Sequence, residues 1–251
     1  MKNWFADYVA GFYTDDPIHN STIRLKQKHT DQVCRNVILL GKTLGLSDQE
    51  MVLAETMGLF HDIGRFKQYA IYGTFKDMES ENHALLGLRE LAAHDVLACC
   101  TKDEKKWITK AIGYHNALEV PVSENGKTLL FIHLLRDSDK LDIWRVFIEY
   151  YKERDKHPNP VVEIGLPDNP QISPQVVAAL NEDRIVHIRD LKTSNDFRLL
   201  LISWVFDLNF IHSFQIVKDL KYIEKIEATL PLSKEISAAV KHAHDYVACH
   251  L

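Results

Sequence analysis

The sequence has few of the features that mark secreted and membrane proteins. Its four cysteines, among 251 residues, form no Cys-x-x-Cys pair and no spacing that predicts a zinc site or a disulfide framework. No apolar run reaches the ~18 residues that a membrane-spanning helix needs. The first ten residues lack the apolar core of a signal peptide. We therefore expect a cytoplasmic protein with no membrane partner.

Excess positive charge is also absent. The chain has 30 Lys and Arg against 35 Asp and Glu, which gives a net charge of -5. Because a general nucleic-acid binder carries a basic footprint, we expect no stable nucleic-acid binding. The hydrophobic fraction of 46% and the charged fraction of 26% are ordinary for a globular protein that buries a core.

Glycine is scarce, and the apolar pattern is helical. Apolar residues recur three and four positions apart along most of the chain, whereas two-residue alternation is rare, so we predict an all-α fold. Ser47 with Glu50 forms a capping-box start, and Ser233 is a candidate N-cap for the last helix. The expected helices cover residues 3–13, 22–44, 48–63, 82–97, 103–114, 126–152, 174–180, 195–226 and 233–248.

The few prolines are concentrated in one segment. Five of the eight lie within residues 156–174, which therefore cannot form one helix. The helical segment that follows, around residues 197–206, is too apolar to stand alone. We expect a single all-helical domain over residues 1–251, with a core at about 20–155 and a C-terminal helical extension at about 175–251 packed on it.

One polar pair interrupts an apolar helical stretch. His61 and Asp62 lie within residues 57–65, where most other side chains are apolar. A carboxylate buried there without a partner would cost several kcal/mol, and a divalent cation would remove that cost. The pair is therefore predicted to bind a metal ion.

Further metal-binding residue types occur at helical spacing with apolar ones. His29, His115 and Asp139 each share a helix face with an apolar row, so each is predicted to point toward the core. His83 is followed one turn later by Gly87, which would let a neighbouring helix or a ligand approach closely. These positions extend the candidate site to several helices.

The candidate ligands together offer four imidazoles and two carboxylates. One such histidine alone is more often a hydrogen-bonded core residue, so the hypothesis depends on their joint occurrence. The set suffices for one octahedral ion or for two ions that share Asp62. The set suits Mn, Fe, Co, Ni, Zn or Mg, and its imidazole content favours a transition metal. The predicted metal ligands are His29, His61, Asp62, His83, His115 and Asp139.

The order of these residues resembles the signature of the HD-domain superfamily of metal-dependent phosphohydrolases, which is named for its His-Asp dipeptide. The resemblance covers about residues 20–150, and residues 59–66, 72–75 and 81–84 are similar to one bacterial subgroup of predicted hydrolases. It implies a compact helical bundle whose ligands come from separate helices. Such proteins mostly hydrolyse phosphate esters or nucleotides.

The resemblance also implies how the ligands divide. A first ion would be held by His29, His61, Asp62 and Asp139. In two-metal branches of the superfamily, the positions of His83 and His115 hold a second ion. Asp139 fits the family's Asp-Lys-Leu form and lies on an apolar row, and Asp137 is the alternative.

The expected function is hydrolysis of a nucleotide or another small phosphate ester by a metal-activated water. Asp62 is the predicted catalytic residue, because it could bind metal and orient or deprotonate the attacking water. Arg65 and Lys140 are predicted to contact the phosphate. Equally good interpretations are a helix-end cation for Arg65 and a solvated side chain for Lys140. A second His-Asp dipeptide, at residues 244–245, is predicted to lie at the surface.

Two other functional classes stay open at this point. One is a regulatory HD module that binds metal and nucleotide without catalysis, and the other is a di-iron oxygenase. The complete ligand series and the nearby cations favour an enzyme over the regulatory module, and the oxygenase is the weaker third interpretation. Two specific activities of the superfamily are not indicated. The Gly-Tyr-Pro run of family members that cleave a cyclic dinucleotide is absent, and the chain has no room for an obvious synthetase domain such as the stringent-response enzymes carry.

Overall fold

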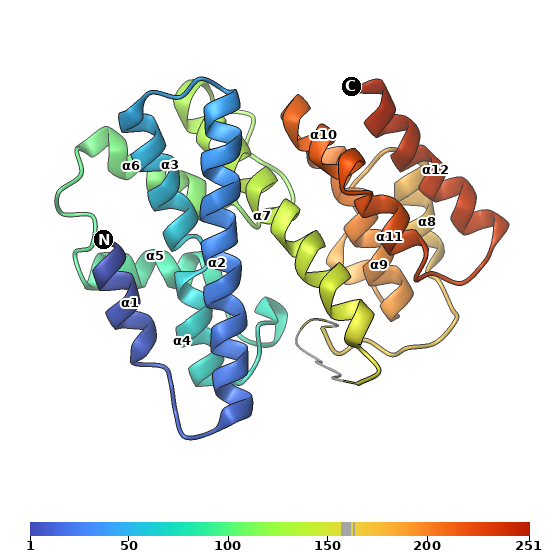
Figure 1. The fold of residues 1–251 in the computed structure, drawn as a ribbon, viewed down its shortest axis with the longest axis horizontal. Helices are drawn as coiled ribbons and strands as arrows, with labels where there is room; N and C mark the ends of the chain where they lie inside the picture. Colours follow the sequence, from blue (N-terminus) through green and yellow to red (C-terminus); the bar gives the residue numbers. More distant parts are fainter. Residues whose placement is uncertain (157–161, 163) are drawn as a thin grey trace. The chain divides into compact units, whose positions relative to one another are not determined.

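The computed structural model describes residues 1–156, 162 and 164–251 (Figure 1). Over these residues the chain is helical and contains no strand, which confirms the predicted all-α class. The chain divides into two compact units, Met1–Asp142 and Ile143–Leu251. Within the described part, no helix is both long and apolar enough to cross a bilayer. The single domain expected from the sequence stays a prediction, and the proline-rich segment at 156–174 lies partly outside the described residues.

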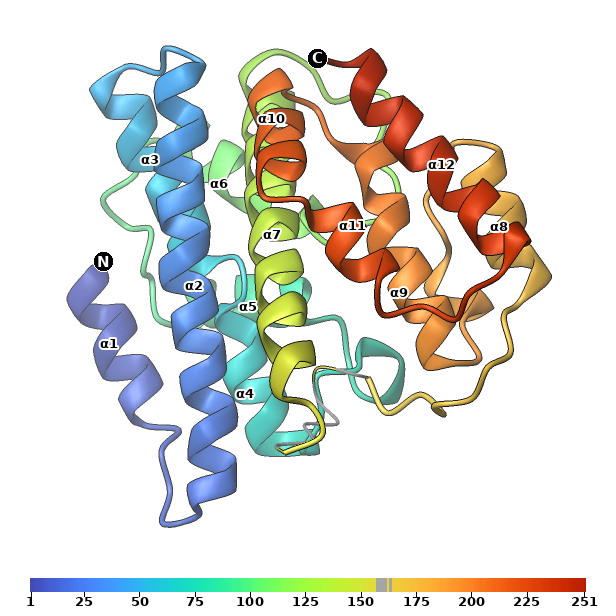
Figure 2. The same ribbon diagram turned by 45° about the vertical axis from the view of Figure 1, so that its right-hand side comes forward.

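The first unit is built on a long helix with shorter ones beside it. Helix α2 lies along α3, and α4 packs against α5 (Figures 1 and 2). Helix α6 contacts both α3 and α5. The elements are α1 (Lys2–Ala10), α2 (Pro17–Thr43), α3 (Asp48–Phe60), α4 (Ile63–Tyr72), the 3-10 turn η1 (Asp77–Glu79), α5 (His83–Ala93), α6 (Lys102–Tyr114) and α7 (Gly126–Glu153), which continues into the second unit.

Local sequence signals fix where several of these helices begin. Asp16 accepts a hydrogen bond from the Ile18 backbone amide at 2.9 Å, and Pro17 occupies the first position of α2. The predicted capping box of α3 is present, with Ser47 and Glu50 each bonded to the other's backbone. These caps satisfy backbone amides that have no partner inside the helix.

The predicted helix 48–63 ends earlier than expected. Helix α3 stops at Phe60, and Asp62 has φ -106° and ψ 14°, outside the helical range. A separate helix, α4, begins at Ile63 and was not predicted from the sequence. The Asp62 side chain makes no capping bond to α4. Its carboxylate is therefore available to the neighbouring histidines.

Helices α4 and α5 cross at two glycines. A Cβ atom at Gly64 would lie 2.6 Å from the Gly87 backbone nitrogen and closer still to the carbonyl oxygen of His83. No side chain fits in that space. The predicted close approach at Gly87 is therefore confirmed as a helix crossing, and it brings the start of α5 next to the start of α4.

The second unit differs from the prediction in one region. The expected single helix 195–226 is wrong, because the chain breaks at an extended stretch at 208–210 and again at Lys221, which has a left-handed φ of 52°. No Gly or Pro signals these breaks. The Trp144 indole donates a 2.8 Å hydrogen bond to the Leu201 carbonyl near the end of α9. The elements of the second unit are α8 (Pro174–Asn181), η2 (Ile188–Asp190), α9 (Ser194–Ser203), η3 (Trp204–Asp207), α10 (Ile211–Asp219), α11 (Tyr222–Glu227) and α12 (Lys234–Cys249).

The last helix follows its sequence signal. The Ser233 side chain accepts a hydrogen bond from the Glu235 amide, which confirms it as the N-cap of α12. Helices α8 and α9 both pack on α12 within this unit.

Candidate metal centre

All six predicted ligands lie in two neighbouring groups inside the first unit. The first group is His29, His61 and Asp139, and the second group is Asp62, His83 and His115. Within each group the ligand atoms lie within 4.8 Å of one another. Each group could therefore hold a metal ion.

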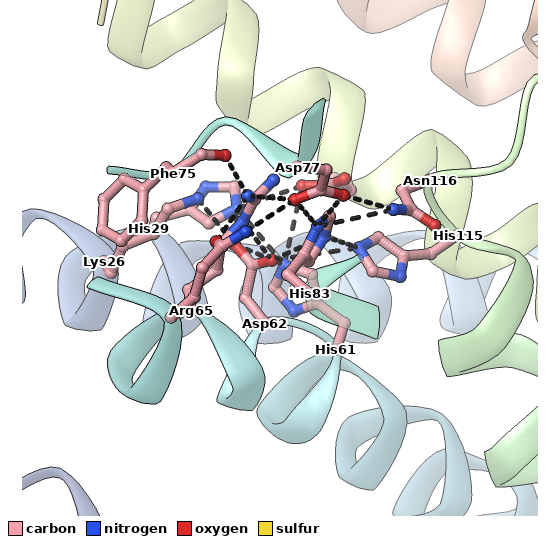
Figure 3. A network of polar contacts seen from close by, with 12 residues as sticks. Lys26, His29, His61, Asp62, Arg65, Phe75, Asp77, His83, His115 and Asn116 are labelled. Atoms are coloured by element: carbon pink, nitrogen blue, oxygen red, sulfur yellow. Dashed lines mark hydrogen bonds and ion pairs between the residues drawn. The ribbon is translucent and has the colours of Figure 1, made fainter. Parts of the chain in front are cut away.

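Five separate elements bring these residues together. His29 comes from the middle of α2, and Asp139 comes from α7. His61 and Asp62 occupy the break between α3 and α4, so both side chains can turn to one centre, which adjacent residues of one helix would not do. The two remaining candidate ligands are His83, the first residue of α5, and His115, the C-cap of α6. Figure 3 shows the imidazoles converging around Asp62.

The Asp62 carboxylate lies between the two groups. Its Oδ2 atom is 3.6 Å from the Nε2 atoms of both His29 and His61. Its Oδ1 atom is 3.3 Å from His83 Nε2 and 3.9 Å from His115 Nε2. Each oxygen thus faces a different group, which is the position of a carboxylate that bridges two ions.

Two of the four imidazoles donate to backbone carbonyls of their own helices. His61 Nδ1 lies 2.8 Å from the Gly58 carbonyl oxygen, and His115 Nδ1 lies 2.7 Å from that of Ile112. A carbonyl oxygen only accepts, so Nδ1 carries the proton in both rings. Nε2 then presents a lone pair to the centre.

The other two imidazoles donate to carboxylates. His29 Nδ1 lies 2.7 Å from Asp142 Oδ2, and His83 Nδ1 lies 2.8 Å from Asp77 Oδ2. A carboxylate behind the imidazole fixes the ring and strengthens its basicity, as is common for histidines that bind metals. All four rings therefore point Nε2 at the centre with the proton on the far nitrogen.

The second group lacks the protons that would satisfy it internally. The Nε2 atoms of His83 and His115 lie 3.0 Å apart, and each ring has its proton on the far nitrogen. In the first group, by contrast, His29 Nε2 lies 3.2 Å from His61 Nε2 and 3.0 Å from the buried Oδ1 atom of Asp139. The facing lone pairs of His83 and His115 fit a cation better than they fit one another.

Burial is nearly complete, which makes these contacts strong. The four histidines and Asp62 are at most 5% exposed. Burial would raise the pKa of the Asp62 carboxyl, but the charge of Lys26 and the electrostatic interaction with the neighbouring His61 hold it well below its usual range. Burial also opposes ionisation of Asp139, yet its contacts with His29 and His61 hold its pKa low. Both carboxylates are therefore charged at neutral pH.

The histidines of the two groups differ in their affinity for a proton. Burial and Lys26 lower the pKa of His29, but its contacts with Asp139 and Asp142 outweigh them and raise it to about 9. Burial and the neighbouring His83 lower the pKa of His115 to about 3. The pKa of His83 is also lowered, chiefly by burial. Only the first group therefore has a histidine that holds a second proton at neutral pH.

Three polar residues of the site were missed by the sequence reasoning. Lys26 Nζ lies 2.6 Å from Asp62 Oδ2, and its position three residues before His29 on one helix face could have indicated it. Asp142 follows Asp139 by three residues on α7, so the same spacing applied to it. Asp77 lies in a turn, where periodicity gives no signal.

Arg65 connects the site to the turn beside it. Its NH1 atom donates to Gln68 Oε1 and Asp77 Oδ1 at 2.9 Å each, and to the Phe75 carbonyl. Its Nε lies 3.5 Å from Asp62 Oδ1. Because α4 begins at Ile63, Arg65 lies in its first turn, so the interpretation as a cation at a helix C-terminus is wrong.

The remaining candidates are placed as follows. Lys140 is 7% exposed, so its interpretation as a solvated side chain is wrong. Its contact with phosphate stays a prediction. Asp137 is fully buried but belongs to neither ligand group. In the second His-Asp dipeptide Asp245 is exposed as predicted, whereas His244 is half-buried.

Comparisons of the chain with protein-family models, with curated proteins and with solved structures each found no match.

Proposed function

We propose that the protein is a metal-dependent hydrolase of small phosphate esters, nucleotides above all, and that it binds two divalent ions bridged by Asp62. The observation that carries the proposal is that the two carboxylate oxygens of Asp62 face different histidine pairs. Oδ2 faces His29 and His61, and Oδ1 faces His83 and His115. Paired metal ions held this way recur in enzymes that cleave phosphoryl bonds. The resemblance to the HD superfamily implies the same activity.

The residues then have separate tasks. Bound ions would lower the pKa of a water molecule and offset the charge that develops on a phosphoryl oxygen. The histidines of both groups and Asp139 would hold the ions, and the hydrogen bonds of the histidines to carbonyls and carboxylates keep the rings in place. Asp62 would join the two groups and position the attacking water. Arg65 fixes the Asp62 carboxylate from the side of Asp77.

The ligand chemistry narrows the choice of metal. Four imidazole nitrogens and two carboxylates suit Mn, Fe, Co, Ni or Zn better than Mg, which prefers oxygen ligands and bound water. We therefore expect activity with a transition metal that exceeds the activity with Mg.

The test is a reconstitution screen. Metal-free protein is loaded separately with Mn, Co, Ni, Fe, Zn and Mg and incubated with nucleoside mono-, di- and triphosphates and sugar phosphates while released phosphate and pyrophosphate are measured. We expect release with at least one transition metal. Oxygen consumption by the Fe-loaded protein in place of phosphate release would favour the di-iron oxygenase. Full metal loading without either reaction would favour the regulatory module.

A further inference from the structure

Lys26 occupies the side of Asp62 that faces the first group. Its ammonium lies 2.6 Å from Asp62 Oδ2, the same oxygen that lies 3.6 Å from His29 Nε2. Figure 3 shows Lys26 and Arg65 on α2 and α4 next to Asp62. A cation is thus already bound to the oxygen that a metal ion in the first group would use.

An ammonium and a divalent ion cannot share that oxygen without a penalty. Both are positive, and at about 4 Å in a partly buried site their charges repel each other. One of the two must move away when both are present. The lysine is the mobile partner, because its charge sits on a flexible four-carbon chain.

Arg65 is not free to move in the same way. One of its nitrogens already donates to Gln68, Asp77 and the Phe75 carbonyl, which ties the guanidinium to its neighbours. The Lys26 ammonium donates to Asp62 Oδ2, and its side chain is 17% exposed. The two cations beside Asp62 therefore differ in mobility.

The Phe75 ring gives the Lys26 ammonium a second contact. While bound to Asp62, the ammonium lies 5.3 Å from the centre of this ring, within the range of a cation–π contact. The ring can therefore stay in contact with the ammonium when it leaves Asp62. From there it can reach an anion bound at the metal ions, and a phosphate group is the strongest such acceptor.

We propose that Lys26 is a displaceable cation, which binds Asp62 Oδ2 in the metal-free protein and moves to the phosphoryl oxygens of the substrate once the first group holds an ion. This inference rests on the proposed function for the identity of the substrate. It makes Lys26 a competitor of the metal and a binder of phosphate. The two roles have opposite consequences when its charge is removed.

The test compares Lys26→Met with the wild-type protein in two titrations. Metal-free protein is titrated with Mn²⁺ by calorimetry, and the variant should bind Mn²⁺ about tenfold more tightly because repulsion is relieved. Mn²⁺-loaded protein is then titrated with inorganic phosphate, and the variant should bind it roughly ten- to a hundredfold more weakly. Unchanged or weaker Mn²⁺ binding, or unchanged phosphate binding, would overturn the proposal.

Two further variants make the test specific. Lys28→Met removes a charge from an exposed position two residues along α2 and should leave both titrations as in the wild type. Lys26→Arg keeps the charge and should bind phosphate more tightly than Lys26→Met does. If both titrations behave as expected but no ester is hydrolysed, only the proposed function fails. If esters are hydrolysed but Lys26→Met changes neither titration, only the role of Lys26 fails.

Discussion

The two ligand groups use the same residue types but balance their charge differently. In the first group, the proton that His29 holds and the ammonium of Lys26 supply positive charge when no metal is bound. In the second group, burial lowers the pKa values of both His83 and His115, so neither ring takes up a second proton at neutral pH. The second group therefore depends more strongly on a metal ion.

This difference shows that the surroundings of a ligand decide what metal binding must displace. An ion entering the first group would displace a proton from His29 and, in our proposal, the ammonium of Lys26. An ion entering the second group would meet two lone pairs that are already directed at it. We therefore expect metal binding at the first group to release a proton and to depend on pH.

The largest effect is expected where the groups share a ligand. Asp62→Ala removes the carboxylate that both groups use, so the purified variant should contain neither ion and show no hydrolysis. His115→Ala affects only the second group and should lower the content from two ions to one. Metal content by mass spectrometry checks both variants. Two ions in Asp62→Ala, or none in His115→Ala, would contradict the shared-carboxylate arrangement.

The next largest effect is expected at the crossing of α4 and α5, where one substitution should affect the second group but not the first. In Gly64→Ala the added methyl group collides with the backbone at Gly87 and His83, so α5 must shift. We expect a loss of about 1–3 kcal/mol in the free energy of unfolding. The second ion should be lost while the first is retained. Thermal unfolding and metal content measure these effects.

The matched control for this change is Gly113→Ala. A Cβ atom there would meet only Leu88, at an ordinary contact distance of 3.5 Å. Replacing a glycine inside a helix should stabilise the protein by about 0.5–1 kcal/mol. A Gly64→Ala protein as stable as this control would show that the crossing is not tight.

The carboxylates behind the histidines should give a smaller and more selective effect. Asp77→Asn and Asp142→Asn each keep an oxygen that accepts from the imidazole but remove its charge. Each should weaken the metal affinity of its own group by about ten- to a hundredfold. Calorimetric titration should show the loss in the second group for Asp77→Asn and in the first group for Asp142→Asn. The same change in both groups from either variant would contradict their independence.

The smallest effect is expected in the pH dependence of the metal-free protein. The folded pKa of His29, about 9, lies above its ordinary value of 6.5, so its contribution to stability is complete below pH 6.5 and is lost as the pH rises through 9. The folded pKa of His115, about 3, lies below 6.5, so stability falls as the pH drops from 6.5 toward 3. Thermal unfolding should therefore show a maximum near pH 6.5.

Bound metal supplies the control for this pH profile. Because an ion in the first group displaces the proton of His29, the loss of stability above pH 6.5 should be smaller in the metal-loaded protein. A metal-free protein whose stability rises steadily from pH 6.5 to 9 would contradict the charge assigned to His29.

The fold could be predicted wherever the signal is local. The caps at Ser47 and Ser233 and the three-and-four spacing of apolar residues located most helices in the first unit and the last helix of the second. The breaks at His61–Asp62 and within 195–226 could not be predicted, because neither region contains a Pro or Gly at the point of interruption. Contacts such as the Trp144 bond to Leu201 form only in the folded chain.

In the candidate site, too, local sequence signals could be predicted, whereas contacts that form only in the folded chain could not. All six candidate residues were indicated by the sequence. His29, His115 and Asp139 lie on apolar helix faces, the His61–Asp62 pair interrupts an apolar stretch, and His83 precedes Gly87 by one turn. The structure brings them into two groups. The pairing of Asp77 with His83 could not be predicted, since it joins a turn to a helix start. The spacing of Lys26 from His29 indicates that both lie on one face of α2. The partner of Lys26, Asp62, depends on the packing of α2 against the start of α4, which spacing along one helix does not reveal.

The bridging role of Asp62 is tested most directly by crystals of the protein loaded with Mn²⁺. Anomalous scattering locates each manganese without reference to the protein atoms. We expect two peaks, one bound to Oδ2 of Asp62 with His29, His61 and Asp139, and the other bound to Oδ1 with His83 and His115. A single peak, or two peaks that do not share Asp62, would contradict the proposed centre.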